Sequence, residues 1–148
     1  MTPPAGGDLL VRLARAASQD TTLKKLDTHF AVRALGNSLI DASTGSGTLA
    51  TVFVDRVESV AQQAKADRWA MMGRVMAHEI GHLLLGTSTH SDTGLMREVW
   101  TLAEMTRNRA QDWMFSRAQR DTLREARLEG RRVTTAAARG GETAASGG

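Results

Sequence analysis

The longest regular pattern in the chain lies between residues 68 and 85, where apolar residues occur on almost every side of a helical projection. Asp67 directly before this segment is a residue type that caps helices, and Gly86 directly after it is one that ends them. A helix that is apolar all round is buried, so we predict a central, buried helix over 68–85. Gly73 and Gly81 inside it cost roughly 1 kcal/mol each relative to Ala, and we expect a neighbouring backbone to pass close to both.

Shorter patterns precede this helix. Apolar residues recur at helical spacing over 8–17 and predict a packing helix. Apolar and polar residues alternate over 29–34 and predict a strand that ends before Gly36. A second strand is predicted over 48–54, which is rich in Val, Thr and Phe and follows a run of turn residues. A helix over 57–64 then leads to the central helix.

Two capping-box patterns follow the central helix. Thr101 with Glu104 predicts the start of a short helix, and Ser116 with Gln119 predicts the start of a longer one that reaches about Glu129. The part of the chain after the central helix is therefore expected to be mostly helical.

Together these elements predict one α+β domain: a small mixed sheet packed on the buried helix, followed by the helical C-terminal part. The length of 148 residues and the hydrophobic content of 41% suit a single core. We expect a flexible N-terminus over 1–7, a single domain over 8–132 and a disordered tail over 133–148, which is rich in Ala, Gly and Thr. Neither a signal peptide nor a membrane span is predicted, and the compartment stays open.

The amino-acid composition excludes some kinds of site and favours others. The chain has no cysteine, which excludes disulfides, thiolate zinc sites and a cysteine nucleophile, so a metal would need His and carboxylate ligands. Lys and Arg number 19 against 16 Asp and Glu, and most of the excess is Arg after residue 106. Acidic residues are interleaved with these arginines, which favours a salt-bridged surface over binding of nucleic acid. An arginine-rich nucleic-acid-binding domain is the alternative that this bias supports.

The candidate chemistry lies on the central helix, where His78, Glu79 and His82 form the pattern His-Glu-x-x-His. Residues four apart lie on the same face of a helix, so both imidazoles can reach one zinc ion while Glu79 points beside it. Two histidines and a glutamate in an apolar helix are otherwise costly, because an unpaired buried polar group costs about 1 to 3 kcal/mol. The pattern therefore predicts a catalytic zinc site.

Such a site needs a third protein ligand. His90 follows the glycine that ends the central helix, and a left-handed cap there would turn the chain back towards the metal. Glu98 or Glu104 on a later segment is an alternative, and Asp92 is another. His90 is the ligand that we predict, with these carboxylates left open.

The run from His78 to Met96 resembles the zinc-binding helix, glycine turn, third histidine and Met-turn of the metzincin metallopeptidases. Ser91 after the third histidine is most similar to the matrixin branch. Three residues separate the second histidine from Gly86 and three more separate Gly86 from His90, where the metzincin pattern has two and two. The resemblance implies a reduced metzincin-like fold.

The resemblance also implies roles for individual residues. The implied zinc ligands are His78, His82 and His90, the general base is Glu79, and Met96 lies beneath the metal. The expected function is zinc-dependent hydrolysis of peptide bonds by a monomeric enzyme that acts on a peptide or protein substrate. A domain that keeps zinc but serves as a non-catalytic binding or regulatory module is the alternative.

Overall fold

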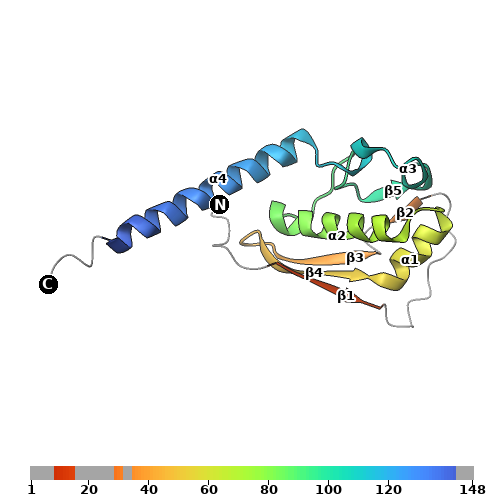
Figure 1. Cartoon of the computed structure of the whole chain (residues 1–148), viewed down its shortest axis with the longest axis horizontal. Helices are drawn as coiled ribbons and strands as arrows, with labels where there is room; N and C mark the ends of the chain where they lie inside the picture. The colour runs from red at the N-terminus through yellow and green to blue at the C-terminus, as the bar shows by residue number, and fades with distance from the viewer. Residues whose placement is uncertain (1–8, 16–28, 32–34, 143–148) are drawn as a thin grey trace.

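The computed structural model describes residues 9–15, 29–31 and 35–142 of the chain (Figure 1). The strands are β1 (Leu10–Ala14), β2 (His29–Ala31), β3 (Gly36–Asp41), β4 (Ser46–Phe53) and β5 (Val99–Thr101). The helices are α1 (Val54–Gln63), α2 (Arg68–Leu85), α3 (Leu102–Arg107), a short 3-10 helix (Ala110–Trp113) and α4 (Arg117–Glu142).

The strands form two small sheets. The three-stranded sheet has the order β1-β4-β3, in which β4 pairs in parallel with β1 and antiparallel with β3. The second sheet joins β2 to β5 in antiparallel fashion. The chain is thus an α+β protein with a small mixed sheet, as the sequence predicts.

Helix α2 lies between the three-stranded sheet and the segment that carries β5 and α3 (Figure 1). Its predicted bounds are confirmed. The side chain of Asp67 accepts a hydrogen bond of 2.7 Å from the amide of Ala70, and Gly86 ends the helix with a positive φ of 63°. The helix is not buried on every side, because Trp69 is 66% and Leu84 50% exposed.

The core lies where α2 meets the other elements. Val52 of β4 and Val57 of α1 pack on one side of α2, and Trp100 of β5 belongs to the same buried cluster. Trp100 is 1% exposed, which makes it a core residue. The sheet and the C-terminal segment are therefore held against a single helix, which also carries the candidate site.

The helix predicted over 8–17 is wrong. Residues 10–14 form β1, which pairs with β4 so that Leu10 lies opposite Leu49. Leu10 and Leu13 are 62% and 55% exposed, so their helical spacing does not mark a packed face. Pairing with a distant strand has overridden a weak local pattern.

Gly36 begins a strand instead of following one. Residues 36–41 form β3, and Phe53 donates a backbone hydrogen bond of 2.8 Å to the carbonyl of Leu35 just before it. The predicted strand over 29–34 is found for 29–31, and 32–34 lie outside the described residues. The predicted strand over 48–54 and helix over 57–64 are confirmed as β4 and α1.

Both capping boxes are confirmed at the starts of α3 and α4. Thr101 and Glu104 exchange side-chain and backbone hydrogen bonds, and so do Ser116 and Gln119. Helix α4 continues to Glu142 and so includes part of the range 133–148 predicted as a tail. No helix among the described residues is both long and apolar enough to cross a bilayer.

The glycines of α2 differ from expectation. A Cβ at Gly73 would have no atom within 4 Å, so no backbone passes close to it. A Cβ at Gly81 would lie 2.5 Å from the sulfur of Met96, so a side chain approaches there. A Cβ at Gly86 would lie 2.3 Å from the carbonyl oxygen of Gly45.

We predict opposite effects on stability of two glycine substitutions, one within α2 and one at its C-terminal cap. Gly86→Ala should lower the free energy of unfolding by at least about 1 to 2 kcal/mol, because the residue is left-handed and its Cβ would collide with Gly45. Gly73→Ala, the matched control, should raise it by about 0.5 to 1 kcal/mol, because the position is helical and open. Urea unfolding measures both, and equal effects would contradict this account of the turn.

Candidate metal centre

Three histidines lie together in the cleft that β3 and α2 line. His78 and His82 lie one turn apart on α2, and His90 comes from the loop after Gly86. One ligand atom from each lies within 4.8 Å of the other two. Within the part of the chain that the structure describes, this is the group of metal-ligating side chains that could hold an ion.

Backbone hydrogen bonds fix the orientation of two of these rings. His78 Nδ1 lies 2.8 Å from the carbonyl oxygen of Leu95, and His82 Nδ1 lies 2.8 Å from that of Thr87. A carbonyl oxygen only accepts, so each Nδ1 must carry the hydrogen and donate it. In a neutral ring the lone pair is then on Nε2. This tautomer is the one that ligates a metal through Nε2.

The two Nε2 atoms face each other at 3.0 Å. Burial lowers the pKa of His78 to about 4 and also lowers the pKa of His82, so both rings are neutral near pH 7. Two lone pairs would therefore meet without a hydrogen between them, which costs energy in a buried site. A cation between the two nitrogens removes that repulsion.

The spacing fits zinc. Tetrahedral zinc with bonds of about 2.0 to 2.1 Å holds its ligand nitrogens about 3.3 Å apart. The observed 3.0 Å between the first two nitrogens lies close to this value, and the third ligand atom is within 4.8 Å of both. The donor set therefore fits a zinc ion with three imidazole ligands and one open position.

The turn at Gly86 places the loop that completes the group. The amide of Thr87 donates to the carbonyl of His82 over 3.2 Å, and the carbonyl of Thr87 accepts from the ring of the same histidine. The left-handed conformation that permits this turn favours glycine. His90 then stacks on the ring of His78, with centroids 5.4 Å apart.

The segment that contains Leu95 and Met96 packs against α2 beside the histidines. Met96 is fully buried, and its sulfur lies against Gly81, the residue directly before His82. The carbonyl of Met96 accepts a hydrogen bond of 2.8 Å from the amide of Ser91. This bond ties the loop that carries His90 to the segment that supplies the Leu95 carbonyl.

Glu79 lies beside the histidines and is 2% exposed. Burial raises the pKa of its carboxyl to about 7, and a hydrogen bond from Ser38 opposes this rise. The Ser38 hydroxyl lies 2.6 Å from Glu79 Oε2. A divalent cation nearby would favour the charged carboxylate. Ser38 has no signal in the sequence, because no local pattern links two residues that are 41 positions apart.

These side chains open on a cleft of about 380 Å³. One wall is β3 and the other is α2 with the loop that follows it. The lining residues are Gly36, Asn37, Ser38, Ile40, His78, Glu79, His82, Ser88, His90 and Glu98. The candidate catalytic and metal-ligating residues of the sequence analysis thus line one space.

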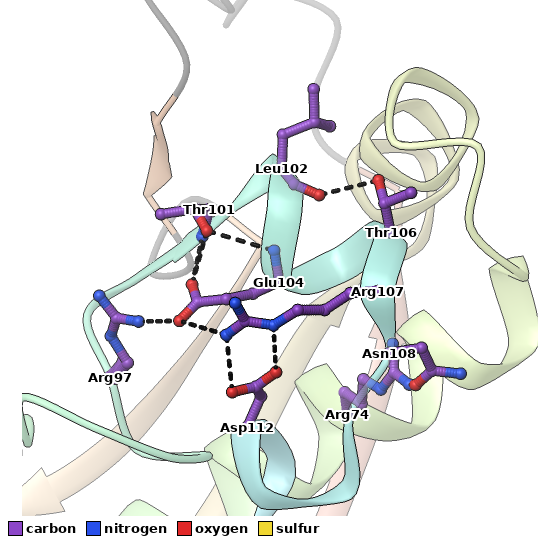
Figure 2. Close-up of polar contacts among 9 residues, drawn as sticks. All are labelled: Arg74, Arg97, Thr101, Leu102, Glu104, Thr106, Arg107, Asn108 and Asp112. Carbon is purple, nitrogen blue, oxygen red and sulfur yellow. Dashed lines mark hydrogen bonds and ion pairs between the residues drawn. The ribbon is translucent and has the colours of Figure 1, made fainter.

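The three carboxylates that could serve as a third ligand instead of His90 do not belong to the histidine group. Glu104 caps α3 through Thr101 and forms ion pairs with Arg97 and Arg107, and Arg107 in turn binds Asp112 (Figure 2). These contacts engage its carboxylate at the start of α3. Glu98 lines the cleft, yet neither it nor the exposed Asp92 belongs to the histidine group.

Two arginines of the C-terminal part, Arg107 and Arg124, form ion pairs with acidic neighbours, as the interleaved charges predict. Arg107 binds Asp112 through two hydrogen bonds of 2.9 and 3.0 Å, and Arg124 lies 3.5 Å from Asp121. The preference for a salt-bridged surface over nucleic-acid binding stays a prediction.

Comparison of the chain with protein-family models, with curated proteins and with solved structures finds no match.

We predict that replacement of His90 weakens zinc binding and that replacement of the candidate carboxylates does not. His90→Ala should lower the affinity of the metal-free protein for zinc by at least about 100-fold, more than the 10- to 100-fold that loss of a residue supporting a ligand costs. Glu98→Ala and Glu104→Gln should leave the affinity within a few-fold of the wild type. Calorimetric titration with zinc measures all three.

The Glu104 variant has a second expected effect. It should lower the free energy of unfolding by about 2 kcal/mol, because Arg97 and Arg107 lose a charged partner. A large loss of zinc affinity in either carboxylate variant, with His90→Ala unchanged, would overturn the assignment of the third ligand.

Proposed function

We propose that the protein is a zinc-dependent hydrolase of peptide bonds, with His78, His82 and His90 as zinc ligands and Glu79 as the general base. The proposal is carried by one observation: two buried imidazoles are held with their Nε2 atoms 3.0 Å apart. The third histidine and the buried Glu79 lie in the same cleft. A metzincin-like metallopeptidase is the kind of enzyme that this arrangement supports best.

The bound ion would supply a Lewis acid that polarises the scissile carbonyl and lowers the pKa of water to about 7. Glu79 would take one proton from the attacking water and later donate it to the leaving amine nitrogen. The carbon–nitrogen bond breaks, the hydroxyl stays on the carbonyl carbon, and the proton ends on the new amine. Burial raises the pKa of the Glu79 carboxyl, which favours retention of the proton between the two transfers, and a nearby cation would act in the opposite direction.

The substrate would bind along β3. Among the described strands, β3 lies at the edge of the three-stranded sheet, and it lines the cleft from Gly36 to Ile40. An edge strand offers unpaired backbone groups to an extended peptide, which can then add as a further strand. Such binding would fix the peptide backbone beside Glu79 with little demand on side-chain sequence.

A catalytic role fits this site better than a structural one. Structural zinc sites are closed by four protein ligands, whereas catalytic sites have three and keep one position open. Among the described residues the group contains three histidines, and the adjacent carboxylate belongs to Glu79. The alternative of a non-catalytic zinc module predicts zinc binding without turnover.

We predict that Glu79→Gln abolishes most of the activity and retains the metal. The amide has the shape of the carboxylate but cannot accept the proton, so kcat should fall by about 100- to 10,000-fold. The measurement is cleavage of denatured casein and of a fluorescence-quenched peptide library by the zinc-loaded protein. Zinc content, determined on the same samples, should be one ion per chain in both proteins.

Two results would contradict this proposal. Full activity of Glu79→Gln would remove Glu79 as the base. Zinc binding by the wild type without cleavage of either substrate would favour the non-catalytic module.

A further inference from the structure

The carboxylate of Glu79 is held by strand β3, on the opposite wall of the cleft. The Ser38 hydroxyl lies 2.6 Å from Glu79 Oε2 and 2.8 Å from the backbone carbonyl oxygen of the same residue. Both distances fit hydrogen bonds. One side chain of the strand therefore contacts Glu79 at its acidic end and at its main chain.

Gly36 closes the other side of the carboxylate. A Cβ at this position would lie 2.7 Å from Glu79 Oε1 and 2.9 Å from its Cγ, so the glutamate occupies the space that a larger residue would fill. Gly36 and Ser38 are two residues apart on one strand and so face the same side. Pairing with Val52 and Ala50 of the central strand fixes their register.

We propose that Ser38 is a positioning residue for Glu79, which it holds in place for proton transfer. The inference rests on the proposed function, because it gives Ser38 a part in the reaction assigned to that site. A glutamate side chain has three rotatable bonds, and the hydroxyl on a paired strand restricts them. The rigid sheet would thus set the position of a base that lies on the helix.

A hydroxyl suits this role for a second reason. It has one hydrogen to donate and also accepts hydrogen bonds. It donates to Oε2 while Glu79 is a carboxylate. Once Glu79 holds the proton taken from water, Ser38 can accept from the acid and turn its own hydrogen to the Glu79 carbonyl. The contact therefore persists through both halves of the reaction.

The test compares Ser38→Ala, Ser38→Thr and a matched control. Ser38→Ala should lower kcat for the peptide library about 10- to 100-fold, the equivalent of one hydrogen bond to a charged group. KM and zinc affinity should stay within about twofold, because Ser38 is not a ligand. Ser38→Thr keeps the hydroxyl and should restore most of kcat.

The control is Ser43→Ala in the exposed turn that leads from β3 to β4. It removes a hydroxyl-to-carboxylate hydrogen bond of the same length, 2.6 Å to Asp41, outside the cleft. Its kcat should equal that of the wild type. A general effect of weakening this hairpin would instead lower kcat in both alanine variants.

A second readout does not depend on activity. In metal-free protein with ¹³C-labelled glutamate, the infrared carboxyl band absent from Glu79→Gln belongs to Glu79. Loss of the Ser38 hydrogen bond should shift that band in Ser38→Ala and not in Ser38→Thr or Ser43→Ala.

The outcomes separate this inference from the proposed function. A wild type that cleaves neither substrate contradicts the proposed function, and the infrared band then still tests the contact. An active wild type with unchanged kcat in Ser38→Ala, or with no rescue by Ser38→Thr, overturns the positioning role alone. An unshifted band overturns the contact on which it rests.

Discussion

Two neutral imidazoles in a buried site point their lone pairs at each other across 3.0 Å, and several elements of the fold hold them in this position. The Leu95 and Thr87 carbonyls hold them so, because each accepts the Nδ1 hydrogen and thereby directs Nε2 inward. The repulsion between the two lone pairs costs free energy, and this cost must be offset by another interaction. A cation between the two nitrogens would supply that interaction. This geometry is the ground on which we propose that the site binds a cation.

Several elements of the fold hold the histidine rings in this position. The left-handed turn at Gly86 returns the Thr87 carbonyl to α2, and its close approach to Gly45 packs this turn on the sheet hairpin. Met96 fills the space that Gly81 leaves and is bonded to the loop of His90. The ion pairs of Glu104 fasten the segment after Met96 to the start of α3 (Figure 2). Helix α2, the three-stranded sheet and the two loops after α2 therefore contact one another around the three histidines.

The features that the sequence predicts well are those formed by residues close together in the chain. The bounds of α2 follow from a capping Asp67 and a terminating Gly86, and both capping boxes lie within four residues. The helix expected over 8–17 fails because its leucines pair with a strand that starts more than thirty residues later. The contact of Ser38 with Glu79 cannot be predicted from the sequence for the same reason, because it forms only when β3 packs on α2. The proximity of His90 to the two helical histidines can be predicted because the glycine turn and the spacing around it are local features.

X-ray absorption at the zinc edge of the zinc-loaded protein tests the three-histidine site directly. We expect a first shell of four nitrogen or oxygen atoms at about 2.0 to 2.1 Å with the outer-shell scattering of three imidazoles. Two imidazoles or fewer, or a shell of six oxygen atoms, would contradict it.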